Sequence, residues 1–211
     1  SLYVSTDSAE KADRLRAILP GAEIRVLPNR GRDIWPKLYG FRDAHDRHEV
    51  VLHLHGKKSP HAAGLNDWLA HNLDCLIGSA GEVSRILSFF ETIPRLGMVV
   101  PLTFRQVLGA AHWGSNLDLA RELAFRLGWP DSALPEDGAL RFPVGSMFWA
   151  RVAAIRPLLD LALTPDHFPP EAGQVDGTLA HAIERMLGVV CQAGGYHLLP
   201  VAGAATRLHR G

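Results

Sequence analysis

Short apolar segments and helical segments alternate along the first quarter of the chain, and this alternation limits the possible folds more than any other feature. Strand character is evident at residues 2–5, 23–27 and 49–55. Apolar residues with helical spacing lie between the first two strands, and a second helix is predicted at residues 37–44. Strands separated by helices pair in parallel through right-handed crossovers. The pattern therefore predicts an α/β fold built on a mostly parallel sheet.

The remainder of the chain supports the same fold class. A buried strand is predicted at residues 96–100 and an apolar, strand-like segment at residues 146–150, with helical periodicity before and after each. At 211 residues the chain is long enough for one sizeable core. We therefore expect a single domain over residues 1–211, arranged in three α/β/α layers. Because the sequence opens directly on a strand and lacks a starting Met, we expect this domain to be part of a longer protein.

Charge and cysteine content exclude several classes of protein. Lys+Arg and Asp+Glu number 22 each, so nothing indicates the basic face of a nucleic-acid-binding domain, and we expect no nucleic-acid partner. No apolar run approaches the roughly 20 residues needed to cross a bilayer, and no signal peptide is evident. Cys75 and Cys191 match no metal or redox spacing and lie among apolar residues, which indicates buried free thiols in a reducing compartment.

Three polar segments follow predicted strands, where open parallel sheets bind their ligands. The first consists of Asn29, Arg30, Gly31, Arg32 and Asp33. Gly31 would let the backbone approach a ligand, and the two arginines are suited to binding phosphate. The alternative is an ordinary turn with solvated arginines, in which Asp33 caps the next helix.

The second polar segment contains His53, His55, Gly56, Lys57 and Lys58. The two histidines share one face of the strand because side chains alternate. The glycine allows a tight turn, and the paired lysines after it fit a diphosphate. Two alternatives remain open, namely an exposed basic turn and a pair of metal-ligating histidines, although the spacing supplies no third ligand.

The third polar segment lies in residues 142–187, where a strand, a helix, an acidic loop and a second helix follow one another. Asp176 lies where the second helix is predicted to begin, and it could be a helix cap or the general base of a reaction in a cleft. Glu171 is the second candidate for that base. His181 and Arg185 lie along the same helix, away from its apolar stripe, and are either surface residues or ligand contacts.

Four further residues could contact a sugar. Gly145 and Ser146 belong to a segment that is most simply a buried strand, but they would also let a sugar approach the backbone. Trp113 and Asn116 lie in a loop rich in aromatic and polar residues, where they could stack on and hydrogen-bond a sugar ring or merely pack.

These segments together resemble the rhamnan synthesis protein F family of bacterial polysaccharide biosynthesis. The resemblance covers Asn-Arg-Gly-Arg-Asp-Ile-x-Pro at residues 29–36 and His-x-Lys-Lys-Ser at residues 55–59. It continues through Gly-Ser-Met-Phe-Trp-x-Arg at residues 145–151 and Asp-Gly-Thr-Leu-Ala-His-Ala-Ile-Glu-Arg at residues 176–185. The motifs span most of the chain in the expected order. They imply a sugar-transferring role in making rhamnose-containing glycans of the cell wall or lipopolysaccharide.

More distantly, the chain is similar to inverting glycosyltransferases of the GT-A fold. The Asn-x-Gly loop of that fold is matched by Asn29 and Gly31, and its late-helix carboxylate base by Asp176. The place of its Asp-x-Asp metal motif is taken by residues 53–55, which read His-Leu-His, so a divalent cation remains an open question. The first strand and helix of the fold would lie before Ser1, so that the fold is either trimmed or the chain is a fragment.

The resemblance implies a glycosyltransferase that uses a nucleotide-sugar donor, such as dTDP-rhamnose, and a lipid-linked or polysaccharide acceptor. Asp176 would be the base, Arg32 and the lysines of the second segment would bind the diphosphate, and Asp7 and Asn29 would contact the nucleotide. Such an enzyme would act at the cytoplasmic face of the inner membrane, associated with it peripherally through other domains. A non-catalytic glycan- or nucleotide-binding module and a histidine-metal hydrolase are the alternatives.

Overall fold

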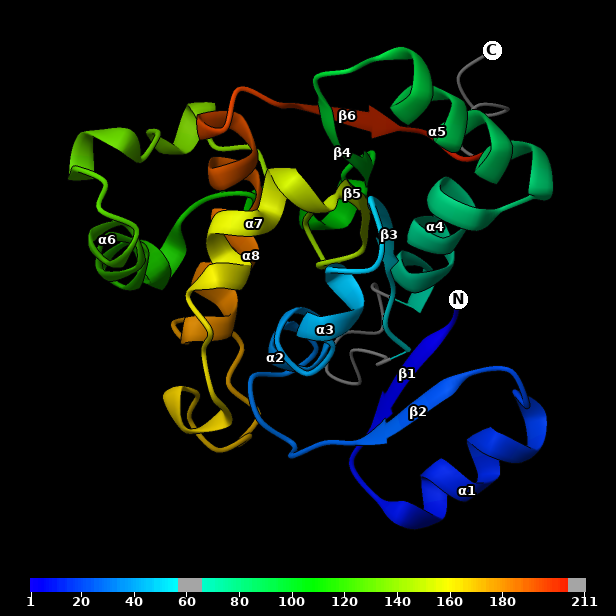
Figure 1. The fold of residues 1–211 in the computed structure, drawn as a ribbon. Helices are drawn as coiled ribbons and strands as arrows, with labels where there is room; N and C mark the ends of the chain where they lie inside the picture. Colours follow the sequence, from blue (N-terminus) through cyan, green and yellow to red (C-terminus); the bar gives the residue numbers. More distant parts are fainter. Residues whose placement is uncertain (57–65, 205–211) are drawn as a thin grey trace.

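The computed structural model describes residues 1–56 and 66–204 (Figure 1). The strands in this part of the chain are β1 (Tyr3–Thr6), β2 (Glu23–Val26), β3 (Val50–His53), β4 (Leu96–Pro101), β5 (Phe148–Arg151) and β6 (His197–Val201). The α-helices are α1 (Ala9–Ile18), α2 (Ile34–Leu38), α3 (Arg42–His45), α4 (Asn66–Ile77), α5 (Ala80–Thr92), α6 (Leu117–Arg126), α7 (Val152–Asp160) and α8 (Leu179–Ala193). Short 3₁₀ turns occupy Arg105–Ala110, Gly114–Asn116, Asp131–Ala133, Asp137–Ala139 and Pro165–His167. The chain is therefore an α/β protein, as predicted.

The strands form two sheets with mixed directions rather than one mostly parallel sheet. β1 and β2 pair in parallel as a two-stranded sheet, while the second sheet has the order β3-β5-β4-β6. Within it β4 and β6 are parallel, but β5 is antiparallel to both of its neighbours. The alternation of strands and helices predicts the relative direction of two strands only where one helix connects them directly, and α1 connects β1 and β2 in this way. The long connection between β4 and β5 imposes no such direction.

Alternating side chains of β5 supply both faces of the core. Phe148 and Ala150 pack into one apolar cluster, whereas Trp149 packs into another, together with Met147 just before the strand. The first cluster is completed by residues of α2, α6, α7 and α8, and the second by residues of α4 and α5. Helices therefore cover both faces of the four-stranded sheet, as Figure 1 shows. Cys75 and Cys191 are buried and free, as predicted.

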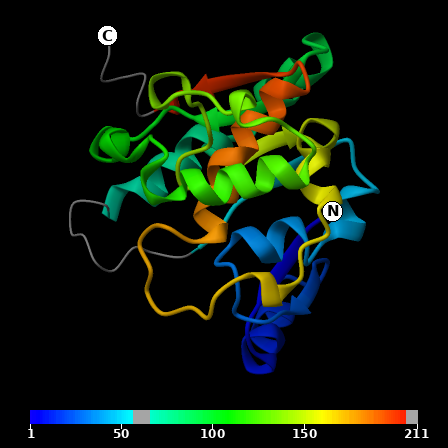
Figure 2. The same ribbon diagram turned by 90° about the vertical axis from the view of Figure 1, so that its left-hand side faces the viewer.

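The small sheet and α1 form a unit at one end of the molecule (Figures 1 and 2). Helix α1 begins after Ser8, whose side chain accepts a hydrogen bond from the Lys11 amide at 3.3 Å. Arg25 of β2 links this unit to the rest of the chain, because its guanidinium donates to the Gly40 carbonyl and to the Asp43 carboxylate, each at 2.7 Å. No helix in residues 1–56 and 66–204 is long and apolar enough to span a membrane.

Helix α8 runs through the centre of the large core. Eleven of its fifteen residues are buried, and they contact the sheet as well as α6 and α7. Its N-cap is Thr178, two residues after the predicted cap at Asp176. Asp176 is thereby left in the loop that leads into the helix, where its carboxylate is free to make contacts with other segments.

Candidate functional site

A tight turn at Gly145 and Ser146, just before β5, lies at the centre of the candidate site. Both residues have positive φ angles, 88° and 52°. A Cβ atom at Gly145 would lie 2.7 Å from Cζ2 of Trp68, so only glycine fits there. Ser146 is one of the few non-glycine residues of the described chain in the left-handed region, a conformation that costs on the order of 1 kcal/mol. Contacts of its side chain and backbone must therefore hold it in place.

Residues of the first polar segment hold the serine. The Ser146 hydroxyl donates to the Asp33 carboxylate, and the Lys37 ammonium donates to the Ser146 carbonyl. Lys37 also pairs with Asp33 at 2.5 Å, one helical turn away. Burial opposes ionisation of Asp33, but the Lys37 ammonium and the serine hydroxyl hold its pKa well below its usual range. Asp33 is therefore a carboxylate that fixes the turn.

Two other segments hold the glycine of the turn. His55 Nε2 lies 2.8 Å from the Gly145 carbonyl, and the Gly145 amide donates to the Glu184 carboxylate of α8 at 2.8 Å. Burial raises the pKa of Glu184 and lowers that of His55, so that the neutral imidazole donates to the carbonyl. Sequence reasoning missed Lys37 and Glu184. The signals that could have found them are the spacing of Lys37 four residues after Asp33 and of Glu184 three residues after His181.

The arginines of the first segment contact the loop that precedes α8. The Arg32 amide donates to Glu171 Oε1 at 2.9 Å, and its guanidinium donates to the Gln174 carbonyl at 2.6 Å. The Arg30 guanidinium donates to the Phe168 carbonyl at 2.9 Å. Three hydrogen bonds thus join residues 30–32 to residues 168–174, which are far apart in the sequence.

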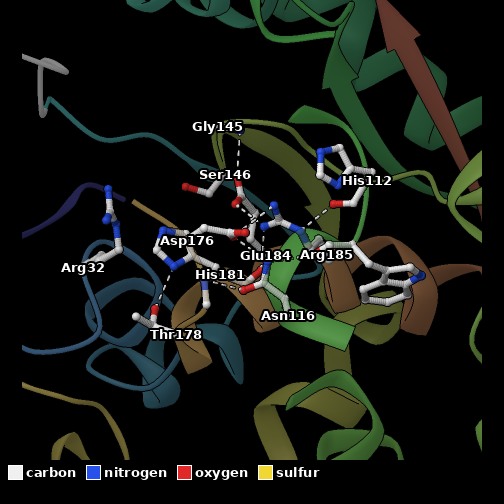
Figure 3. A network of polar contacts seen from close by, with 12 residues as sticks. Arg32, His112, Asn116, Gly145, Ser146, Asp176, Thr178, His181, Glu184 and Arg185 are labelled. Carbon is white, nitrogen blue, oxygen red and sulfur yellow. Dashed lines mark hydrogen bonds and ion pairs between the residues drawn. The ribbon is translucent and has the colours of Figure 1, made fainter. Parts of the chain in front are cut away.

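Asp176 joins the beginning of α8 to the turn at Gly114–Asn116. Its carboxylate accepts hydrogen bonds from the Ser115 amide at 3.0 Å and from Asn116 Nδ2 at 2.5 Å, and it lies 3.5 Å from Nη2 of Arg185 (Figure 3). Burial opposes ionisation, but these donors lower the pKa of Asp176. Gly114, at φ 57°, is required here, because a Cβ atom would lie 2.5 Å from Asp176 Oδ2.

His181 and Arg185 line the same region from one side of α8, but both are buried. His181 Nδ1 lies 2.8 Å from the Thr178 hydroxyl. Burial and then the positive charge of Arg32 lower the pKa of His181 to about 4, so its imidazole is neutral at pH 7. Arg185 donates to the His112 carbonyl at 2.8 Å and to the His181 carbonyl at 3.0 Å, which makes it an internal anchor of the site.

Other predicted residues lie away from this cluster. His53 is buried in the core, stacked on Phe148 and 3.3 Å from the ring nitrogen of His45, so it does not share an accessible face with His55. Trp113 is 4% exposed and donates from Nε1 to the Pro135 carbonyl, so it packs inside the protein.

The nucleotide contacts that the resemblance implies are less well defined. Asn29 is exposed, and Asp7 is exposed and pairs with Lys11 of α1 at 2.6 Å. Lys57 and Lys58 lie outside the described residues. The roles of all four in binding a donor remain predictions.

The described side chains do not provide a ready metal site. Within residues 1–56 and 66–204, no three His, Cys, Asp or Glu side chains form a group that could hold a metal ion. The histidines at 53 and 55 are directed to His45 and to the Gly145 carbonyl, respectively. The described residues therefore hold no preformed site of three such ligands.

Fold and site together define an α/β domain with mixed sheets, in which polar loops from four parts of the sequence meet beside the beginning of α8. The chain belongs to the rhamnan synthesis protein F family, whose model matches residues 1–196. Family membership implies a part in polysaccharide biosynthesis and confirms the resemblance that the four motifs indicate.

Two curated proteins are similar to the chain. The chain is 40% identical over 182 residues to the uncharacterized protein WxcX of Xanthomonas campestris pv. campestris, both in strain B100 and in strain ATCC 33913. The aligned region covers 85% of this chain but 25% of either relative. The chain thus spans about a quarter of the length of the relatives it matches. No solved structure matches the chain.

Proposed function

We propose that this chain is the glycosyltransferase domain of a longer polysaccharide-assembly protein, and that it transfers a sugar from a nucleotide-sugar donor to a growing cell-surface polysaccharide. The observation that carries the proposal is the contact between Arg32 and the loop that contains Asp176. The Arg32 guanidinium donates to the Gln174 carbonyl at 2.6 Å, two residues before Asp176. A cation for the leaving diphosphate and a carboxylate for the attacking hydroxyl thereby meet at one loop, although they are far apart in the sequence.

The chemistry follows from these two groups. An acceptor hydroxyl would attack the anomeric carbon of the donor, forming the new carbon–oxygen bond as the bond to the diphosphate oxygen breaks, with inversion at that carbon. Asp176 would take the hydroxyl proton, and its lowered pKa keeps it ionised and able to do so. Arg32 would neutralise charge that develops on the diphosphate. Glu171, which contacts the Arg32 amide, is the alternative base.

The family name makes rhamnose the first sugar to test. We extend the proposal, with the same family membership as its support, to dTDP-rhamnose or another nucleotide sugar as donor, a lipid-linked or polysaccharide acceptor, and action at the cytoplasmic face of the inner membrane. Lys57 and Lys58 would add positive charge at the diphosphate, while Asp7 and Asn29 would contact the nucleotide.

One observation favours a second candidate, a non-catalytic module that binds a glycan or nucleotide. Both oxygens of Asp176 already accept hydrogen bonds within the protein, and the guanidinium groups of Arg30 and Arg32 already donate to backbone carbonyls. Groups that are satisfied in this way can simply hold loops in place. A transferase would have to exchange some of these contacts for contacts with its substrates.

Turnover by the full natural protein distinguishes the two candidates. Release of nucleoside diphosphate is measured with a panel of nucleotide sugars, with and without a membrane extract as acceptor, and donor binding is measured by calorimetry. We expect Asp176→Asn to lower turnover by a factor of about 100 or more, the usual contribution of a general base, and to leave donor binding unchanged. Asp118→Asn is the matched control, because the Asp118 side chain is 91% exposed on α6.

The possible results separate the roles clearly. Near-normal turnover by the Asp176→Asn protein would exclude Asp176 as the base, and the same assay on Glu171→Gln would then test the alternative. Binding of a nucleotide sugar without any turnover by the natural protein would favour the binding module.

A further inference from the structure

The edges of the two sheets face each other across an open groove. Residues 1–5, which precede and enter β1, line one side, and residues 50–56, in and after β3, line the other; the space between them has a volume of about 700 Å³. In the part of the chain that the structure describes, β1 pairs with β2 only and β3 with β5 only. Unpaired strand edges are normally covered or paired in folded proteins, because they otherwise recruit other strands.

The two strands that border the groove run in the same direction. At their amino ends, the Tyr3 hydroxyl lies 3.0 Å from Nε2 of His48, which precedes β3. Arg32 and Asp33 line the same groove. Figure 1 shows β1 and β3 with this common direction. An extended segment between them could therefore pair in parallel with both.

Backbone groups on both edges point into the groove. The Leu2 and Thr6 carbonyls accept hydrogen bonds from residues at the ends of β2, so by alternation the amide and carbonyl groups of Tyr3 and Ser5 point the other way. On the opposite edge, the Glu49 carbonyl accepts from Val152, next to β5. The peptide groups of residues 50 and 52 therefore point toward those of residues 3 and 5.

One face of the groove is closed by helices. Pro36 of α2, Ala44 and His45 of α3, and Phe41 between these helices line it, and the Phe41 ring packs on Tyr3 at a centroid distance of 5.7 Å. Helices α2 and α3 thus cover this face of the groove in the way that a helix layer covers a sheet. A strand in the groove would therefore bury every second side chain against α2 and α3.

We infer that the groove receives one β-strand from a segment of this protein outside residues 1–211, inserted in parallel between β1 and β3. The insertion joins the two sheets into one with the order β2-β1-inserted strand-β3-β5-β4-β6. A two-stranded sheet is only marginally stable by itself, whereas a sheet of more strands with a buried apolar face can be stable. A second copy of the chain is a poor occupant, because a strand already held in a folded sheet cannot enter between two others.

Two further considerations favour the protein's own chain as the source. The curated relatives are much longer than this chain, which covers a quarter of their length. A strand that enters here and leads through a crossover helix to β1 also continues the right-handed succession of β1, α1 and β2. Chain order would then change direction between the inserted strand and β3, and such switch points are where α/β sheets bind ligands.

One consequence rests on the proposed function. The carboxyl end of the inserted strand would reach the groove wall formed by Arg32, Asp33 and His55. The donor site would thus be complete only in the longer protein. The strand insertion itself does not depend on transferase activity, so the two can fail separately.

Hydrogen exchange measured by NMR tests the inference by comparing residues 1–211 with the full natural protein. In the full protein, the amides of Tyr3, Ser5, Val50 and Leu52 are expected to exchange at least about tenfold more slowly, since each gains a hydrogen-bond partner. The amide of Val4, which points to β2, is the internal reference and should change less. Equal exchange of the four amides in the two proteins would overturn the inference.

A proline substitution provides the second measurement. Ser5→Pro removes an amide that points away from β2 and has no strand partner among the described residues, but would bond to the inserted strand in the full protein. We expect it to lower the melting temperature of the full protein more than that of residues 1–211, with Ser5→Ala as the control in both. An equal shift in the two proteins contradicts strand insertion. If the four amides are protected in the full natural protein but that protein turns over no nucleotide sugar, only the proposed function is contradicted.

Discussion

The Ser146 hydroxyl donates a hydrogen bond to the Asp33 carboxylate, and it thereby joins two loops that are 113 positions apart in the sequence. Ser146 reaches Asp33 from a left-handed backbone conformation at φ 52°. The carboxylate is in turn kept ionised by Lys37. The hydroxyl–carboxylate contact and the backbone strain therefore oppose each other at one residue, and substitutions can separate them.

Substituting Ser146 should give an order of stabilities that depends on both effects. Ser146→Ala loses a hydrogen bond to a charged group but retains the strain, so we expect the free energy of unfolding to fall by about 2 kcal/mol. Ser146→Gly loses the same bond but relieves about 1 kcal/mol of strain, and should be the more stable of the two variants. Urea denaturation gives both values. An alanine variant more stable than the glycine variant would show that the backbone conformation is not strained.

Gly114 should be intolerant of any side chain. Gly114→Ala places a Cβ atom 2.5 Å from Asp176 Oδ2 and also requires an alanine at φ 57°. We expect a loss of about 2 kcal/mol or more in the free energy of unfolding. Gly109→Ala is the matched control, because no atom lies within 4 Å of its added Cβ, and its effect should stay within about 0.5 kcal/mol. Thermal denaturation of the two variants makes the comparison, and equal effects would contradict the role of Gly114.

Arg32 should contribute to binding the diphosphate of a donor. Arg32→Gln removes the charge near His181, and we expect the affinity for a nucleotide sugar to fall by about tenfold, as for one hydrogen bond between charged groups. The affinity for the unphosphorylated nucleoside should not change. Arg95→Gln is a suitable control, since Arg95 also donates to a backbone carbonyl, that of Gly195, but far from the site loops. Calorimetric titration of the full natural protein provides the measurement, and an equal loss for nucleoside and nucleotide sugar would place Arg32 outside the diphosphate site.

Stability should depend on pH through His181. Its pKa is about 4 in the folded protein and 6.5 as its ordinary value, so between these pH values the unfolded state binds a proton that the folded state does not. The contribution of His181 to the free energy of unfolding is complete above pH 6.5. It is lost as the pH falls toward 4, at up to about 1.4 kcal/mol per pH unit. His181→Gln should make this decline shallower, as measured by urea denaturation at a series of pH values. Burial also lowers the pKa of His45 and His53, so part of the decline remains. An unchanged pH profile would contradict the assignment to His181.

Much of the secondary structure could be predicted from the sequence, because local patterns determine it. The strand–helix–strand unit of β1, α1 and β2 forms as predicted, with parallel strands. The antiparallel direction of β5 could not be predicted, since it depends on contacts with β3 and β4 that no local pattern encodes. The burial of Phe148 and Trp149 on opposite faces of that strand follows from alternation whichever way the strand runs.

Clustering of the site loops was also predictable, but the partners of individual side chains were not. The first segment and the stretch before α8 do meet, through Arg32 and Glu171. His53 shows why the details could differ: strand alternation alone places it on one face with His55, but its imidazole is buried against His45, and His55 lies beyond the end of β3. Asp176 likewise lies ahead of the helix cap, because its carboxylate bonds to the distant Ser115 amide.

The burial of α8 has a consequence for how a protein of this kind can diverge. The helix that carries His181, Glu184 and Arg185 is also a main structural support of the domain, so most changes along it would damage the fold before they altered recognition. New donors or acceptors would therefore have to be accommodated by the exposed loops around it. If the proposed transferase function holds, directed evolution aimed at a different sugar should concentrate its libraries on residues 169–175 and leave the helix unchanged.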